Sequence, residues 1–169
     1  MNCSIVYSSR TGNTAQLANT LKDLLTQDNS CLYFGAPDAR ALQADLLFVG
    51  FWTDKGCCDQ LLKDFLQTVH GKTVALFGTA GFGADPAYFE RILGNVAACL
   101  PSDNRVLPGF MCQGRMPQAV RDRYENQLEQ NANDSMAKRM IENFDMALSH
   151  PSETDLQAMG SWLGSLPLA

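Results

Sequence analysis

Short apolar segments alternate along the chain with segments in which apolar residues recur every three or four positions. The short segments are typical of β-strands that are covered on both faces of a sheet, and the others of amphipathic helices. The predicted strands span residues 3–7, 31–34, 46–51, 73–77 and 105–112. Because parallel strands need crossover connections, this alternation predicts an α/β fold with a doubly wound, five-stranded parallel sheet. No repeat or linker interrupts it, so residues 1–169 are expected to form a single domain.

Several predicted helices have recognisable starting residues. Asp59 is expected to cap one helix, Asp85 with Pro86 opens another, and Ser152 with Asp155 forms a capping box before the last. Four apolar helix faces are expected to be buried. They comprise Leu17, Ala18, Leu21, Leu24 and Leu25; Leu61, Leu62, Phe65, Leu66 and Val69; Phe89, Ile92, Leu93, Val96 and Ala97; and Leu156, Met159, Trp162, Leu163 and Leu166.

The turn after the first strand has the features of a site for a phosphate group. Directly before the first helix it contains Ser9, Arg10, Thr11, Gly12, Asn13 and Thr14. The free N–H groups of a first helical turn and the helix dipole attract an anion, Gly12 permits close approach, and the hydroxyl groups add donors. Arg10 is a possible cation for the same anion. The alternative is an ordinary polar turn with Thr11 or Asn13 as the N-cap of the helix.

Two common nucleotide motifs are missing from the chain. It has no G-x-x-x-x-G-K-[ST] string, and no set of three spaced glycines follows the first strand. The turn therefore fits a single monophosphate ester better than a nucleoside triphosphate or a dinucleotide.

The loops after the third and fourth strands are expected to meet this turn at one edge of the sheet. Ligands bind beyond the carboxyl ends of parallel strands, where the strand order reverses. Each of these loops combines an aromatic residue with glycines and small polar residues, as a planar ring system with a polar edge requires. The candidate residues are Trp52, Thr53, Asp54, Lys55 and Gly56, and Thr79, Ala80, Gly81, Phe82 and Gly83. Alternatively, Trp52 and Phe82 are core residues.

The spacing of residues in and after the first strand resembles the flavodoxin signature. Ile5, Val6, Tyr7, Ser9, Gly12, Thr14, Ala18 and Leu21 match its defined positions, and a looser likeness extends to about Cys112. Residues 50–56 also resemble a narrower group of flavodoxin-like proteins, which includes the flavodoxin-like partner of bilirubin reductase in gut anaerobes. The resemblance implies a sheet in the order 2-1-3-4-5. It also implies an FMN cofactor, with its phosphate at residues 9–14 and its ring between Trp52 and Phe82.

The same resemblance implies an electron-transfer protein that shuttles electrons between a reductase and an acceptor oxidoreductase. One alternative is an enzyme on the same fold, an NAD(P)H-dependent quinone or flavin reductase that uses bound FMN. Another is a binding module that has lost FMN, although the many phosphate donors of residues 9–14 argue against it. The fold alone does not choose among these functions.

Residues 115–150 depart from the short-chain members of that family. This segment is polar and carries two narrow apolar stripes, which predict a pair of helices with a break at residues 131–134. The stripes are Met116, Val120, Tyr124 and Leu128, and Met136, Met140 and Phe144. Pro117 suits the start of the first helix. This helical elaboration before the last helix is either a docking platform for a partner oxidoreductase or a surface addition that packs on the sheet edge.

Composition narrows the class of protein further. The net charge of −5 and the pI near 4.9 argue against nucleic acid as a partner. Mean hydropathy is −0.14, and no apolar run approaches the length of about 18 residues that spans a membrane. The first strand begins almost at residue 1, which leaves no room for a signal peptide. We therefore expect a cytoplasmic protein.

The six cysteines show no C-x-x-C or metal-ligand spacing. Most of them lie in apolar segments and are expected to be small buried residues. The pair Cys57 and Cys58 follows the third strand in a loop that could face the cofactor, so a redox role is its alternative interpretation.

Overall fold

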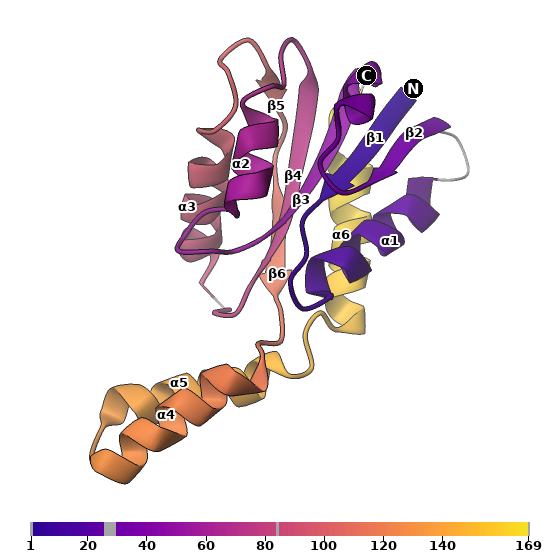
Figure 1. Cartoon of the computed structure of the whole chain (residues 1–169). Coiled ribbons are helices and arrows are strands. Elements are labelled where there is room, and N and C mark those ends of the chain that lie inside the picture. Colours follow the sequence, from indigo (N-terminus) through magenta and orange to yellow (C-terminus); the bar gives the residue numbers. More distant parts are fainter. Residues whose placement is uncertain (1, 26–29, 84, 169) are drawn as a thin grey trace.

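A parallel β-sheet forms the centre of the molecule (Figure 1). The computed structural model describes residues 2–25, 30–83 and 85–168. Its strands are β1 (Asn2–Tyr7), β2 (Ser30–Gly35), β3 (Leu46–Trp52), β4 (Thr73–Ala80), β5 (Arg105–Val106) and β6 (Phe110–Gln113). They lie in the order β2-β1-β3-β4-β5, β6 also pairs with β4, and the pairings are parallel. The predicted fold class and strand order are therefore confirmed.

Helices cover both faces of the sheet, α1 and α6 on one side and α2 and α3 on the other (Figure 1). The helices are α1 (Asn13–Leu25), α2 (Gln60–Leu66), α3 (Pro86–Ala97), α4 (Gln118–Gln130), α5 (Ser135–Ala147) and α6 (Glu153–Ser165). A short 3-10 helix, η1 (Ala39–Gln43), connects β2 to β3. None of the helices in the described ranges is long and apolar enough to cross a membrane.

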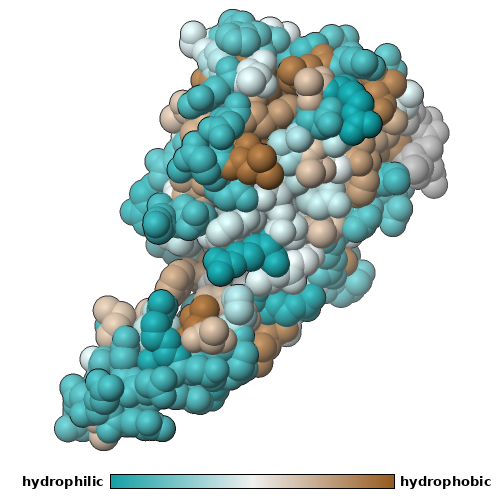
Figure 2. All heavy atoms as spheres, in the orientation of Figure 1, coloured by the Kyte–Doolittle hydropathy of each residue, from teal (hydrophilic) through white to brown (hydrophobic). Residues whose placement is uncertain are grey.

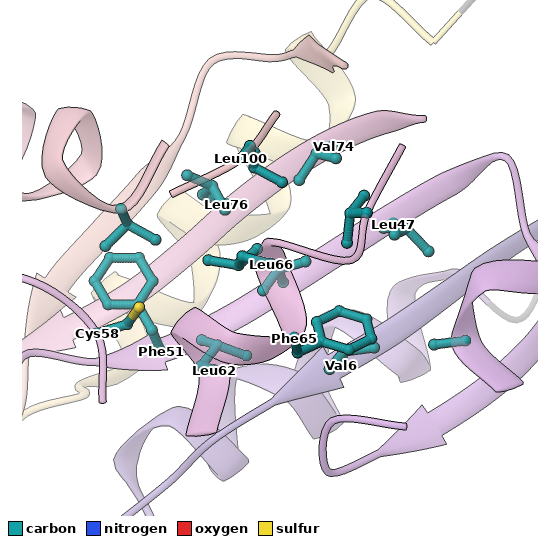
Figure 3. Close-up of a cluster of buried hydrophobic side chains, with 14 of the residues drawn as sticks. Val6, Leu47, Phe51, Cys58, Leu62, Phe65, Leu66, Val74, Leu76 and Leu100 are labelled. Atoms are coloured by element: carbon teal, nitrogen blue, oxygen red, sulfur yellow. The ribbon is translucent and has the colours of Figure 1, made fainter. Parts of the chain in front are cut away.

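Two apolar cores lie on opposite faces of the sheet, because successive side chains of a strand point to opposite sides. Ile5 belongs to the core beneath α1 and α6, and its neighbour Val6 belongs to the core beneath α2 and α3. Figure 3 shows the second core, where Leu62 and Leu66 of α2 lie over the sheet beside Phe51. Two leucines predicted to be buried, Leu24 and Leu61, are 46% and 58% exposed. They lie at the edges of their helices' apolar stripes, whose width is only slightly more than 100°.

The predicted fifth strand is divided into two short segments, β5 and β6, which both pair with β4. Pro108 has no N–H to donate to the sheet, so the ladder is interrupted there. The carbonyl of Pro108 instead accepts a hydrogen bond from the Trp162 indole (N···O 2.9 Å). Gly109 passes so close to α3 that a Cβ atom would lie 2.6 Å from Leu93 Cδ2. Because the strand is interrupted at Pro108, β5 pairs with the start of β4 and β6 pairs separately with its end.

Helices α4 and α5 form a hairpin that projects away from the sheet (Figures 1 and 2). Its two ends meet where Arg115 N–H donates to the carbonyl of His150 (3.0 Å). Phe144 is its most buried large side chain, and the Arg121 guanidinium lies over that ring (5.8 Å to the centroid) while also bonding Asp145 and Glu125. The predicted pair of helices is confirmed. It does not pack along the sheet edge, because both ends of the segment lie beyond the end of β6.

We predict that Trp162→Phe lowers the free energy of unfolding by about 1–3 kcal/mol, because it leaves the carbonyl of Pro108 without its donor. Urea denaturation measures the change. Ser161→Ala, on the exposed side of the same helix, is the control. Equal stability losses in the two variants would show that the indole hydrogen bond does not hold the interruption between β5 and β6.

Candidate functional site

A cavity of about 320 Å³ lies at the carboxyl ends of β1, β3 and β4. Eleven of the predicted site residues line it: Arg10, Thr11, Asn13, Trp52, Thr53, Lys55, Gly56, Thr79, Ala80, Gly81 and Phe82. The other five, Ser9, Gly12, Thr14, Asp54 and Gly83, belong to the same three loops but do not line the cavity. Three basic side chains and no acidic one line it among the described residues. In a chain of net charge −5, this cavity is therefore locally suited to an anion.

The turn after β1 is built around Gly12, whose φ of +90° is a backbone conformation that favours glycine. The Gly12 carbonyl accepts the first helical hydrogen bond from Gln16 (3.0 Å), so Gly12 occupies the N-cap position of α1. Ser9 Oγ accepts from the N–H of Ala15 (3.2 Å). The alternative with Thr11 or Asn13 as the N-cap is therefore wrong. The first N–H groups of α1 have no acceptor within the helix, by the geometry of any α-helix.

Side chains of the first loop join it to other parts of the site. Thr14 is fully buried, and its hydroxyl lies 3.1 Å from the Thr79 hydroxyl at the end of β4. Asn13 Nδ2 donates to Thr11 Oγ1 (2.9 Å) and to the carbonyl of Arg115 (2.8 Å). The Oδ1 atom of Asn13 is buried and has no hydrogen-bond partner among the described residues. It is an acceptor available to a ligand that brings a hydroxyl group.

Trp52 is positioned by Asp59, for which the sequence indicated only a capping role. Asp59 Oδ1 accepts from the N–H of Leu62 (3.0 Å), which confirms the cap of α2. Its Oδ2 atom accepts from the Trp52 indole (3.0 Å) and from the hydroxyl of Ser8. The Arg10 guanidinium lies over the Trp52 ring, 5.3 Å from its centroid. One carboxylate thus joins the ends of β1 and β3 to the start of α2 and holds the indole by its edge.

The loop after β3 ends in a tight turn with Lys55 and Gly56 at its centre. Asp54 and Cys57 exchange two backbone hydrogen bonds (2.8 and 3.0 Å), and both central residues have positive φ, 50° and 78°. This is the pattern of a type I′ turn, in which a residue with a side chain such as Lys55 is unfavourable. Asn95 Nδ2 of α3 donates to the Gly56 carbonyl (2.9 Å). The turn is therefore held from α3 in its exposed position.

One wall of the cavity was not predicted. It is formed by Tyr88, Gly114, Arg115, Met116, Pro117 and Val120, from α3 and from the base of the hairpin. A Cβ atom on Gly114 would lie 2.5 Å from Asn13 Nδ2, and one on Gly81 would lie 2.5 Å from Met116 Sδ. The glycines thus allow the loops to meet this wall closely. In the sequence, only the glycines Gly81 and Gly114 indicated a close approach at this wall. The contacts themselves could not be predicted, because they join segments that are far apart in the sequence.

Tyr88 supplies the only phenol that lines the cavity among the described residues. Its ring meets Phe82 edge to face, with centroids 6.4 Å apart and an interplanar angle of 88°. Burial raises the pKa of Tyr88, and the positive charge of Arg91 acts in the opposite direction. The phenol is therefore protonated near neutral pH and is able to donate a hydrogen bond into the cavity. Phe82 itself lines the cavity and is 42% exposed, so it is not a core residue.

The carbonyl of Gly81 connects the loop after β4 to the hairpin. It accepts hydrogen bonds from Gln113 Nε2 (2.9 Å) and from Asn143 Nδ2 of α5 (3.0 Å). Gln113 also donates to Asn143 Oδ1 (3.2 Å), and it is almost fully buried. A Cβ atom on Gly83 would lie 2.5 Å from Gln113 Oε1, so the loop lies directly against this side chain. The hairpin is thus hydrogen-bonded to the cavity wall.

The strand order and a cavity beyond the carboxyl ends of β1, β3 and β4 define an α/β protein of the flavodoxin type. The family model described as "Flavodoxin domain" matches residues 4–163, and the chain belongs to the flavodoxin family. It is 43% identical over 187 positions to the "Flavodoxin-like domain-containing protein BilS" of Clostridium symbiosum (strain WAL-14163), an alignment that covers 100% of this chain and 98% of that protein. A protein of the same description from Clostridioides difficile (strain CD3) is 30% identical, over 92% of this chain and 90% of that one.

Solved structures agree with this fold. A short-chain flavodoxin associated with a bacterial microcompartment has a TM-score of 0.53 and 20% identity, covering 86% of this chain and 97% of that one. Oxidised Flavodoxin 2 from Bacillus cereus also has a TM-score of 0.53, with 16% identity over 96% and 94%. The apo form of an NADH:FMN oxidoreductase, EMOB, has a TM-score of 0.51 and 20% identity over 90% and 97%. Because proteins described as flavodoxins and one described as an oxidoreductase share this fold, the function must be argued from the site.

We predict that Asp59→Asn loosens Trp52 while leaving the cap of α2 in place. An amide oxygen can still accept from the N–H of Leu62, but an amide nitrogen cannot accept from the indole or from Ser8. In a Trp162→Phe background, acrylamide quenching of Trp52 fluorescence should increase, and the free energy of unfolding should fall by about 1–3 kcal/mol.

The control for this variant is Asp64→Asn, which changes an exposed carboxylate of the same helix. If quenching of Trp52 were the same in the Asp59 and Asp64 variants, Asp59 would have no part in positioning the indole.

Proposed function

We propose that this chain binds one FMN in the described cavity and acts as a cytoplasmic electron-transfer protein between a reductase and an acceptor oxidoreductase. The observation that carries the proposal is the composition of the cavity wall. Arg10, Lys55 and Arg115 line it without an acidic side chain, beside the N-terminus of α1, and Trp52 and Phe82 supply flat apolar surface. An anionic ligand with a planar ring needs both features in one place.

The phosphate group would lie on residues 9–14. The first N–H groups of α1 are free of helical acceptors, and the helix dipole favours an anion at this end. At Gly12, apart from the two adjacent residues, no atom of the described ranges lies within 4 Å of the position that a Cβ would take, so the turn is open on that side. Arg10 is exposed and flexible enough to turn from the Trp52 face to a phosphate. Asn13 Oδ1, which has no hydrogen-bond partner among the described residues, would accept a hydrogen bond from a ribityl hydroxyl group of FMN.

The ring of the cofactor would lie against Trp52, with Phe82 and Tyr88 at its outer edge. When bound, FMN supplies both one-electron and two-electron redox chemistry, which allows a carrier to connect different kinds of partner. This chain's own residues would set the surroundings of that ring. The Thr53 N–H and hydroxyl both donate to the Thr79 carbonyl (3.0 and 2.8 Å), so the two ring-binding loops keep their spacing. Lys55 would stabilise negative charge on the reduced ring.

The alternative, an NAD(P)H-dependent quinone or flavin reductase, is favoured by one observation. The protonated Tyr88 phenol lies in the cavity with the apolar side chains of Met116, Pro117 and Val120, which would suit an apolar substrate. The absorption spectrum of the FMN-loaded protein, recorded anaerobically before and after NADPH alone, separates the two functions. A yellow protein that stays oxidised supports the carrier. Bleaching by NADPH alone, slowed in Tyr88→Phe, supports the enzyme, and a protein that takes up no FMN contradicts both.

We predict that Arg10→Ala weakens FMN binding about tenfold, which corresponds to about 1.4 kcal/mol, and leaves riboflavin binding nearly unchanged. Only FMN carries the phosphate dianion that the guanidinium would contact. Quenching of flavin fluorescence on titration with protein measures both affinities. Arg123→Ala, an exposed arginine of α4, is the control. An equal loss for FMN and riboflavin would place Arg10 at the ring and not at the phosphate.

We predict that Asn143→Ala lowers FMN affinity about threefold to tenfold, although Asn143 does not line the cavity. The change removes one of the two donors to the Gly81 carbonyl and frees the loop that carries Phe82. Visible circular dichroism of bound flavin reports the loss of a fixed ring environment. Glu142→Ala, on the exposed face of α5, is the matched control. If both variants bound FMN like the unchanged protein, the hairpin would not support the cavity wall.

A further inference from the structure

Cys57 and Cys58, which are neighbours in the sequence, form a cluster of three thiols with the distant Cys99. The Sγ atoms of Cys57, Cys58 and Cys99 all lie within 4.8 Å of one another. Cys57 ends the turn after β3, Cys58 is the next residue, and Cys99 lies just after the end of α3. Their spacing along the chain gave no sign of this cluster, because Cys99 lies 41 residues beyond Cys58. All three are free thiols.

The three cysteines differ in their exposure to solvent. Cys58 is fully buried, and Figure 3 shows it beside Phe51 and Leu62. Cys57 and Cys99 are half-buried and so lie within reach of an ion from solvent. None of the three thiols lines the cavity described above. The cluster is therefore separate from the cavity, although Cys57 directly follows Gly56 of the cavity wall.

Three thiols so close together are unfavourable as anions without a cation between them. Burial raises the pKa of Cys58, and the neighbouring charges of Cys57 and Cys99 raise it further. Burial and Cys57 act in the same way on the pKa of Cys99. Lys63 acts in the opposite direction on both. A bound metal ion would replace the repulsion between thiolates with direct coordination.

We propose that Cys57, Cys58 and Cys99 bind one thiophilic metal ion, Cu⁺ or Zn²⁺, as three thiolates. Thiolates select these soft or borderline ions. With metal–sulfur bonds of about 2.3 Å, sulfur atoms around a tetrahedral ion lie roughly 3.8 Å apart. To reach that spacing, the sulfurs have to approach one another by no more than about 1 Å.

The binding step is an exchange of protons for metal and involves no oxidation. Three metal–sulfur bonds form as three S–H bonds release their protons to solvent. Three sulfur ligands complete the coordination of Cu⁺. Zn²⁺ would take a water molecule as its fourth ligand on the side of Cys57 and Cys99, where the site is open. Either ion would join the turn after β3 to the end of α3, next to the hydrogen bond from Asn95 to Gly56.

The test uses the full chain, reduced and free of metal, without FMN, in an anaerobic titration. Zn²⁺ is titrated against a chromophoric chelator, with Co²⁺ as a spectroscopic substitute, and Cu⁺ is titrated against a Cu⁺-specific chelator. We expect one equivalent of one of these ions to bind, with thiolate-to-metal charge-transfer absorption for Co²⁺ or Cu⁺. Cys57→Ala and Cys99→Ala, which change half-buried residues, should each weaken binding at least 100-fold, and Cys31→Ala should not.

Several outcomes would overturn the proposal. They are binding that is equally tight in Cys31→Ala and in the cluster variants, stoichiometry well below one, and conversion of the thiols to a disulfide without metal uptake. Circular dichroism of each variant shows whether it has kept its fold, and Cys57→Ala remains informative if Cys58→Ala does not fold. Which of the two ions binds more tightly distinguishes a Cu⁺ site from a Zn²⁺ site. Because FMN is absent, failure here leaves the proposed flavin site untouched.

Discussion

The hydrogen bonds at the carboxyl end of β4 hold the site together. Thr79, Ala80 and Gly81 are consecutive, and each receives a bond from a different part of the chain. The Thr79 hydroxyl pairs with Thr14 of α1, and the Thr79 carbonyl accepts from Thr53. The Ala80 carbonyl accepts from the N–H of Gly114 (2.9 Å).

Gly81 completes this arrangement by accepting from Gln113 and Asn143. Buried backbone carbonyls that lack a donor are costly, so each loop that reaches this strand end has a definite place. Because β4 also pairs with β3, β5 and β6, its position is set by the sheet before the loops are considered. The positions of the loops around the cavity therefore depend on the position of β4, to which they are hydrogen-bonded.

The hairpin of α4 and α5 contributes to the cavity wall, although most of it is polar and projects away from the sheet. Its outer part is largely polar on the face shown in Figure 2, and no residue of α4 is fully buried. Its base, however, supplies Arg115, Met116 and Pro117 to the cavity wall, and Asn143 reaches the loop after β4. The segment leaves and rejoins the fold at one point, where Arg115 bonds His150. A change at the hairpin can therefore reach the cavity through a few hydrogen bonds, without a change in the sheet.

The sequence by itself determined the features that depend on residues close together in the chain. Strands covered on both faces, the caps at Asp59, Asp85 and Ser152, the turn around Gly12 and the aromatic residues after β3 and β4 are all local signals, and the structure agrees with them. Knowing that parallel strands end at one edge was enough to place eleven of the sixteen predicted residues around a single cavity.

Only the tertiary structure decided which distant segments meet. It brought Cys99 to Cys57 and Cys58, Tyr88 to Phe82, the hairpin base to Asn13, and the Trp52 indole to the carboxylate of Asp59. In the tertiary structure, the Thr14 hydroxyl also lies against the Thr79 hydroxyl. The predicted fifth strand is interrupted at Pro108, whose carbonyl accepts a hydrogen bond from the Trp162 indole. Helical and strand periodicity report which face of an element is buried, but not which partner covers it. The partner depends on how all the elements pack together, and that information is not present in any short stretch of the chain.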